Sequence, residues 1–406
     1  FVGVTTLFHI LWRRAPGPLD QSLIMLNAAA YFGISYAILF HEFRPWMGGF
    51  TLLLSLLYVL LGYAVLLRSR EHLHLTLCTL GIALVFLTIA IPVQLGGPWI
   101  SVAWAVEGAV LIWLSFTLRM RQLRLLGTLV FAAFAAYLLF VDAPDALEAS
   151  FRPFLNVYMP AYAIAIAITY LVAYLLYREK GALQQWEEYL FPAFLVAGNL
   201  FLTITVPIQA AGAWIAVTWA VEALVLVWLS FRLGLYQLRL FSLGVFAILA
   251  VRLLAFDTRD VDLEIFRPII NLRFLAFAVG IASMCLAAYS LQRWKERLVD
   301  KREEYLILVF MGVANFLTLW VLSAEIISSV DSGTFDMEMG IREDVKSLSL
   351  SILWAIYAGA AIVIGIVKRL RYIRLAGLAL LTVPVIKLFA FDIFALAGQL
   401  REVGCP

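Results

Sequence analysis

The sequence predicts an all-α, polytopic transmembrane protein, because its composition and the arrangement of its charges both fit a chain that crosses a bilayer many times. Of its 406 residues, 64% are hydrophobic and only 14% are charged, and the mean hydropathy is +0.96. Soluble domains are about 45–50% apolar and about 25% charged. With about 20 apolar residues in each membrane-spanning helix, this content suffices for about thirteen spans. A soluble globular protein and a secreted disulfide scaffold are therefore excluded.

We predict thirteen complete helices, each an apolar segment bounded by charged or turn-forming residues. In chain order they cover residues 22–40, 46–68, 72–93, 99–118, 123–141, 156–177, 188–208, 213–233, 238–256, 271–291, 305–325, 347–367 and 373–393. The apolar segment before the first helix, residues 1–12, is too short to cross a membrane, so we expect the sequence to begin partway through a helix.

Charged residues alternate in sign from one connection to the next. The basic connections lie at 13–14, 68–70, 119–124, 178–180, 232–239, 293–302 and 368–374. The connections between them are acidic or nearly uncharged, and the acidic ones are 142–155, 257–270 and 326–346. Because Lys and Arg concentrate in cytoplasmic loops, we expect the basic connections in the cytoplasm and the acidic ones on the periplasmic or extracellular side. With 30 Lys and Arg against 27 Asp and Glu, the chain has no overall basic field for nucleic acid.

An internal repeat organises most of the chain. Residues 86–125 recur at 201–240 with an offset of 115 and no gap, and 25 of the 40 positions are identical. A weaker third copy places Trp354 at the position of Trp104. Each copy contains four helices in about 115 residues, and because four is even the copies are parallel rather than inverted. We therefore divide the chain into N-terminal helices at 1–70 and repeats at 71–185, 186–301 and 302–406, the last without its fourth helix.

The repeat carries a set of motifs that resembles a known family. P-x-Q-x-x-G-x-W-x-x-x-x-W-A-x-E is followed by a Q-L-R-L turn, [KR]-L-x-x-F-D and F-R-P-x-x-N. From about Glu71 to its end the chain resembles the bacterial predicted membrane proteins known as domain of unknown function 2339. The resemblance implies a multi-spanning inner-membrane protein, often with a soluble or coiled N-terminal region, and it implies no biochemical activity. Asn156 and Asn271, which end F-R-P-x-x-N, are expected N-caps of the fourth helix.

Two glutamates, Glu107 and Glu222, are the strongest candidates for a functional site. Each lies near the middle of a predicted span, where an ionisable group costs at least about 2.5 kcal/mol. They can face an internal cavity and bind a proton, a cation or a polar substrate. Alternatively, each is hydrogen-bonded at a helix contact and holds the bundle together. The third copy has Tyr357 here, which offers a hydroxyl without a charge.

Aromatic and amide side chains flank these glutamates. Trp104 and Trp219 lie three residues before them, on the same helical face, where they either line a ligand pocket or pack. Gln94 and Gln209 end the first helix of each copy, each two residues after a proline. Proline frees a backbone carbonyl one turn earlier, which can contact a substrate, although a plain helix end explains the pattern equally well.

A basic residue precedes an aspartate by five positions at the outer end of the third helix. The pairs are Arg252 with Asp257 and Lys387 with Asp392. Such a cation can snorkel toward water and hold an anionic headgroup or substrate, or it can form a structural ion pair.

No catalytic, metal or nucleotide motif appears: HExxH, GxSxG, CxxC and P-loop patterns are all missing from the sequence. We therefore predict no cofactor and lean away from an enzyme. Three functions remain open: a transporter or small-ligand or lipid-binding membrane protein that uses the repeated carboxylates, a scaffold of the bacterial envelope, and a membrane transferase acting on lipid-linked substrates. Membrane lipids are the expected partners, other envelope membrane proteins are candidates, and the oligomeric state stays open.

Overall fold

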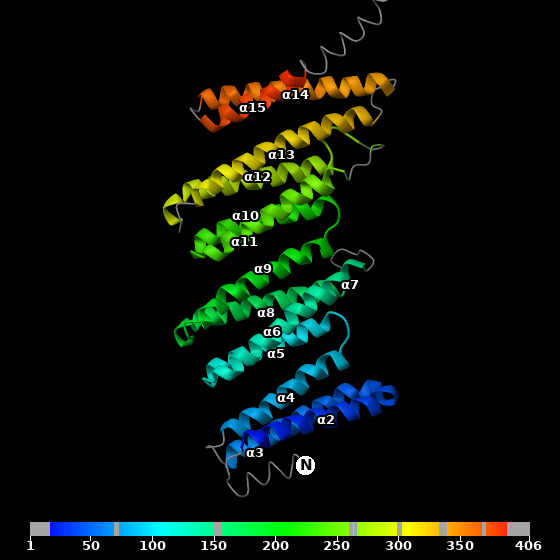
Figure 1. Cartoon of the computed structure of the whole chain (residues 1–406), viewed down its shortest axis with the longest axis vertical. Coiled ribbons are helices and arrows are strands. Elements are labelled where there is room, and N and C mark those ends of the chain that lie inside the picture. Colours follow the sequence, from blue (N-terminus) through cyan, green and yellow to red (C-terminus); the bar gives the residue numbers. More distant parts are fainter. Residues whose placement is uncertain are drawn as a thin grey trace, which may run out of the picture. The chain divides into compact units, whose positions relative to one another are not determined.

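The computed structural model describes residues 17–68, 73–148, 156–259, 263, 266–298, 303–332, 339–367 and 371–387, and every regular element among these residues is a helix (Figure 1). The chain divides into two compact units, residues 1–209 and 210–406. The predicted division into N-terminal helices at 1–70 and repeats at 71–185, 186–301 and 302–406 stays a prediction.

The first unit begins with α2 (Pro18–Phe43), a single 3₁₀ turn η1 (Arg44–Trp46), α3 (Met47–Arg68) and α4 (Leu73–Gln94). Helices α3 and α4 pack closely together. Their backbones approach at Gly62, where an added Cβ would lie 2.8 Å from the hydroxyl of Thr79. Small residues at such contacts let membrane helices pack by close van der Waals contact.

The rest of the first unit consists of α5 (Trp99–Thr117), α6 (Arg121–Tyr137), η2 (Leu138–Asp142), α7 (Ala143–Glu148), α8 (Tyr158–Arg178), η3 (Lys180–Ala182), η4 (Glu187–Tyr189) and α9 (Leu190–Gln209). Helix α5 packs on α6 and α8, and α8 packs on α9. A core of buried residues that includes Phe134, Tyr162 and Phe201 fills the space between them. Helices α5 and α6 meet at Gly108 and Gly127.

The second unit consists of α10 (Ala213–Leu233), α11 (Tyr236–Arg252), η5 (Leu253–Asp257), α12 (Leu272–Arg293), η6 (Lys295–Arg297), α13 (Glu304–Asp331), α14 (Met339–Val367) and α15 (Arg371–Lys387). Helix α10 packs on α11 and α12, α12 on α13, and α14 on α15. Each unit has one described helix that continues into a five-residue π turn: α6 continues into η2, and α11 continues into η5. Such widened turns redirect side chains and are often found at functional sites.

Eleven segments of the described chain are long and apolar enough to cross a membrane, and they are Leu19–Val65, Leu75–Gln94, Trp99–Thr117, Arg121–Leu147, Tyr158–Arg178, Glu187–Gln209, Ala213–Leu233, Tyr236–Asp257, Leu272–Arg293, Glu304–Asp331 and Arg342–Val367. This number differs from the predicted thirteen for two reasons. The first segment joins α2 and α3, and α15 has only 17 residues within its described length.

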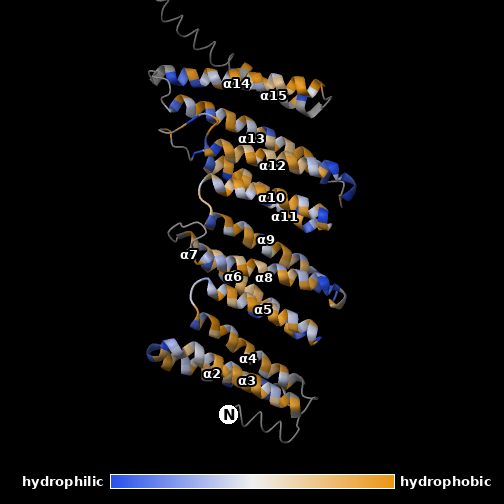
Figure 2. Cartoon of the chain, turned by 180° about the vertical axis from the view of Figure 1, so that it is seen from behind, coloured by the Kyte–Doolittle hydropathy of each residue, from blue (hydrophilic) through white to orange (hydrophobic). Residues whose placement is uncertain are grey.

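Hydrophobic residues, coloured orange, extend along the helices, whereas hydrophilic residues, coloured blue, gather near the helix ends (Figure 2). Large apolar residues such as Leu129 and Phe140 are well exposed within predicted spans. Water would oppose such exposure, and lipid favours it. The protein is therefore a multi-pass membrane protein whose helices contact lipid.

Candidate functional site

Glu107 lies in the middle of α5 and is only 7% exposed. Its Oε1 accepts a hydrogen bond of 2.8 Å from the hydroxyl of Thr88 on α4. Its Oε2 is buried and has no hydrogen-bond partner among the described residues. A buried polar atom without a partner costs free energy, so the site is partly satisfied and can accept one further group.

Thr88 offers two alternative bonds. Its Oγ1 lies 2.8 Å from Oε1 of Glu107 and 3.0 Å from the carbonyl oxygen of Leu84. A hydroxyl has one proton to donate and also accepts. It can donate to an ionised Glu107, or it can donate to Leu84 and accept from a protonated Glu107. Both protonation states of the carboxyl therefore fit the same geometry.

Trp104 also connects α5 to Thr88 of α4. Its Nε1 donates to the carbonyl oxygen of Thr88 at 3.0 Å, and its ring meets that of Tyr137 edge to face at 5.5 Å. Trp104 and Glu107, which lie three residues apart, thus both contact Thr88. The indole bond and the ring contact support a packing role for Trp104, which lies about one helical turn before Glu107 on α5.

A second buried carboxylate lies near the N-terminal end of α5. Asp142, the last residue of η2, is 1% exposed and accepts a hydrogen bond from the hydroxyl of Ser101. Ser101, Trp104 and Glu107 follow one another at intervals of three residues, which places them along one side of α5. This line of polar groups extends about 9 Å from the end of α5 to its middle, at 1.5 Å per residue.

In the second unit, Glu222 is 8% exposed and occupies the middle of α10. Toward the N-terminal end of that helix the structure brings Arg252, Asp257 and Trp219 together. The Arg252 guanidinium donates to the carbonyl oxygen of Gly212 at 2.9 Å, lies 3.5 Å from the Asp257 carboxylate and lies over the Trp219 ring at 5.9 Å. Its charge is therefore balanced within the protein.

The remaining predicted residues are dispersed. Gln209 exchanges hydrogen bonds of 3.1 and 3.2 Å with Asn156, whereas Gln94 is exposed at the end of α4. The Tyr357 hydroxyl donates to the carbonyl oxygen of Asn315 at 3.3 Å. Lys387 is the last residue of α15 and its side chain lies outside the described part of the structure, as does all of Asp392.

The predicted N-cap at Asn271 is confirmed, whereas the N-cap of α8 is Val157 and Asn156 lies one residue before it. Oδ1 of Asn271 accepts the amide of Phe274 at 2.7 Å, and Oδ1 of Asn156 accepts the amide of Met159 at 2.9 Å. Each bond satisfies one of the backbone donors that the first turn of a helix leaves unpaired.

Sequence reasoning missed three buried ion pairs. Arg124 binds Glu187 through bonds of 3.1 and 2.7 Å, and Arg239 lies 2.7 Å from Glu303. Both pairs lie toward the basic connections, where each arginine was interpreted only as a marker of sidedness. The third pair, Arg273 with Glu325 at 2.7 Å, lies toward the acidic connections.

A signal for the first two pairs was present in the repeat. Arg124 and Arg239 occupy the same position of the Q-L-R-L turn, and Glu187 and Glu303 the same position of E-E-Y-L. Thr88 likewise recurs as a threonine in the second copy. No such signal exists for the third pair, because the first copy has a tyrosine and a glutamine at its two positions.

No group of three metal-binding side chains occurs in the part of the chain that the structure describes. The arrangement at Glu107 offers one carboxyl and one hydroxyl, which suits a proton or a weakly held cation better than a structural metal ion.

The family model of the predicted membrane protein DUF2339 matches residues 1–145 and 232–403. This chain belongs to the DUF2339 family. The family match includes Glu107 and its partners on α4 and α5, whereas Glu222 falls in the interval that the family model does not match. No curated protein matches the chain, and neither does any solved structure.

Proposed function

We propose that this DUF2339 protein binds a proton or small cation within the membrane at its repeated carboxylates, Glu107 and Glu222, and acts as a transporter or ligand-binding membrane protein. The observation that carries the proposal is the buried Oε2 of Glu107, which has no hydrogen-bond partner among the described residues. Intramembrane carboxyl groups of this kind mark ion and proton pathways in many membrane proteins.

The surroundings of Glu107 support a change of protonation. Thr88 can donate to the carboxylate or accept from the carboxylic acid without any movement of α4 against α5. Ser101 and Asp142 add polar groups on the outer side. A proton that reaches Glu107 from that side would follow the polar line of α5.

The proposal includes a finer architecture of thirteen spans in three parallel four-helix repeats, in the bacterial inner membrane. The basic connections face the cytoplasm, and 142–155, 257–270 and 326–346 face the periplasm or the exterior. Three features support it: α2 and α3 are separate helices joined by η1, the π turns η2 and η5 are 115 residues apart, and the ion pairs Arg124–Glu187 and Arg239–Glu303 recur at the repeat spacing.

Proton uptake by the full chain in liposomes tests the function. The liposomes contain a pH-sensitive dye, and a potassium diffusion potential drives uptake. We expect the Glu107→Gln/Glu222→Gln double variant to lower the rate to that of empty liposomes, because glutamine keeps the volume and the acceptor but carries no titratable proton. Glu42→Gln is the control, since Glu42 is exposed at the end of α2. An unchanged rate in the double variant, or a wild-type rate no higher than that of empty liposomes, overturns the proposal.

A scaffold of the bacterial envelope is the second candidate, and the buried ion pairs favour it. Arg124 and Glu187 join α6 to the turn before α9, which is a role in assembly rather than in transport. A scaffold tolerates Glu107→Gln but not the loss of Glu187. No observation favours the lipid-linked transferase, because the carboxylates Asp142 and Asp257 belong to separate compact units.

A further inference from the structure

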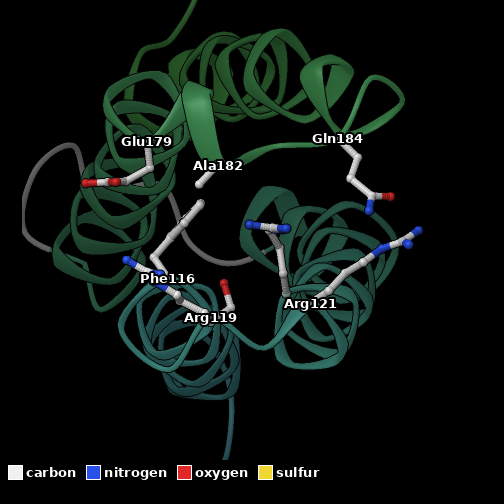
Figure 3. A pocket seen from close by; sticks show the side chains of 8 residues that line it. Phe116, Arg119, Arg121, Glu179, Ala182 and Gln184 are labelled. Atoms are coloured by element: carbon white, nitrogen blue, oxygen red, sulfur yellow. The ribbon is translucent and has the colours of Figure 1, made fainter.

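A pocket of about 510 Å³ opens in the first unit, at the end where the basic connections lie (Figure 3). It is lined by Ser115, Phe116, Arg119, Arg121, Arg124, Glu179, Ala182 and Gln184. These residues come from the end of α5, the start of α6 and the turns that follow α8. Several candidate spans end here, so the pocket lies at the level where lipid phosphate groups meet water.

The pocket carries positive charge that the protein does not balance. Arg124 is neutralised by its two bonds to Glu187, and Glu179 is paired with Arg178 at 3.6 Å. Arg121 is 44% exposed and only 3.5 Å from the same Glu187 carboxylate. Arg119 forms no ion pair within the described part of the chain. Arg121 also lies over the Trp186 ring at 4.9 Å. Among the described residues, Glu187 is thus the carboxylate that faces Arg121 and Arg124 together, and with Arg119 the pocket keeps a surplus of positive charge.

The backbone at Arg119 gives an independent reason to look for a ligand. Arg119 has a positive φ of 55°, at the position that ends α5, where the amide of Met120 closes back on the carbonyl oxygen of Ser115 at 3.0 Å. This left-handed position favours glycine. The same turn of the second copy has Gly234, with a φ of 69°. An arginine is therefore present where the fold prefers a glycine.

The second copy fills the corresponding space. Trp294, which replaces Glu179, packs on the Phe231 ring at 4.9 Å. Arg297, which replaces Ala182, donates to the carbonyl oxygen of Phe231 at 3.4 Å. The open pocket thus depends on residues that are particular to the first copy.

We propose that this pocket binds a phosphate group through Arg119 and Arg121. Guanidinium groups match phosphate oxygens with paired hydrogen bonds, and basic pockets between membrane helices suit anionic headgroups. Figure 3 shows Arg119 and Glu179 on one side of the pocket and Arg121 and Gln184 on the other. For a phosphate to receive bonds from both sides, these two long side chains turn inward from their opposite margins of the pocket. The site is separate from Glu107 and does not rest on the function proposed above.

Binding of phosphatidylglycerol to the full chain, measured by native mass spectrometry from detergent, tests the proposal. Phosphatidylcholine is the neutral comparison, and competition by inorganic phosphate distinguishes a free phosphate ester from a lipid headgroup. Either source supports the proposal. Arg119→Gly/Arg121→Tyr introduces the residues of the second copy, and we expect affinity to fall by at least about tenfold, since charge-assisted bonds are lost. The single variant Arg119→Gly removes an unfavourable backbone position and keeps the test valid if the double variant unfolds.

Two further variants separate a specific site from general charge attraction. Ala182→Arg introduces the second-copy residue at an exposed position and fills the pocket while adding a positive charge. We expect it to abolish binding, whereas attraction by charge alone would increase it. Arg232→Gln/Arg293→Gln removes two exposed arginines outside the pocket and is expected to bind as the wild type does. Undiminished binding by Ala182→Arg, or an equal loss in this control, overturns the proposal.

Discussion

The buried pair Arg124–Glu187 allows a sharp prediction about stability. Glu187 is fully buried and receives two bonds from Arg124, at 3.1 and 2.7 Å, and one from the backbone amide of Gln184 at 2.9 Å. Breaking a buried pair by removing one partner costs about 3–5 kcal/mol, because the other charge is left buried. We expect Glu187→Gln to lower the free energy of unfolding by this amount.

Removing the arginine instead of the glutamate should lower the free energy of unfolding by less. In Arg124→Met, Glu187 keeps the Gln184 amide, and Arg121 already lies 3.5 Å from its carboxylate. A charge-assisted bond contributes about 1.5–3 kcal/mol, so Arg121 should offset roughly half of the loss and leave a cost of about 2 kcal/mol. The double variant Arg124→Met/Glu187→Gln leaves no buried charge from the pair and should differ little from Arg124→Met.

The assay is unfolding of the purified chain in mixed micelles with a rising mole fraction of dodecyl sulfate, followed by tryptophan fluorescence. The double-mutant cycle should give a coupling energy of about 3–5 kcal/mol in magnitude, which is large even for two residues in direct contact. Glu188→Gln is the control, because this exposed neighbour should change stability by less than about 0.5 kcal/mol. The reasoning is refuted if Glu187→Gln costs no more than this control, or if the two single changes are additive.

Three further predictions use the same unfolding assay. Gly127→Ala should lose about 1–3 kcal/mol, because the new Cβ would lie 2.9 Å from a backbone carbonyl oxygen of α5; Gly244→Ala, which has open space, should be neutral or stabilising. Asn271→Ala should cost about 1 kcal/mol more than Asn156→Ala, because its second partner is a carboxylate rather than a neutral amide; equal losses would contradict this. Arg119→Gly should gain about 1 kcal/mol by removing a left-handed arginine, and a loss of stability would show that the turn needs its side chain.

Hydropathy predicted the bounds of the apolar, membrane-crossing segments more closely than the bounds of the complete helices. The segments expected at 99–118 and 213–233 are found as Trp99–Thr117 and Ala213–Leu233. In contrast, the helix expected at 347–367 begins at Met339. Polar residues at its start are compatible with a helix in water, and they interrupt only the apolar pattern from which a span is predicted.

The candidate site was predicted only as far as its charges are visible in sequence. Glu107 is conspicuous because an ionisable residue in an apolar segment is rare. Its partner Thr88 is not conspicuous in the sequence. A threonine is common in a membrane helix, because its hydroxyl can bond to the backbone carbonyl oxygen four residues earlier. The partners Arg124 and Glu187 are 63 residues apart, and only the packing of the helices shows that their charges meet.

Recurrence within the sequence does not by itself separate function from folding. Glu107 and Glu222 recur, and so do the residues of the ion pairs Arg124–Glu187 and Arg239–Glu303, whose contacts explain them as connections between helices. What distinguishes Glu107 is a carboxylate oxygen that the described fold leaves without a partner. Arg119 is distinguished in the opposite way, because it departs from the glycine of the second copy at a cost to the backbone. A feature that the fold does not need, or that it tolerates at a cost, is better evidence of a ligand than a feature that is merely repeated.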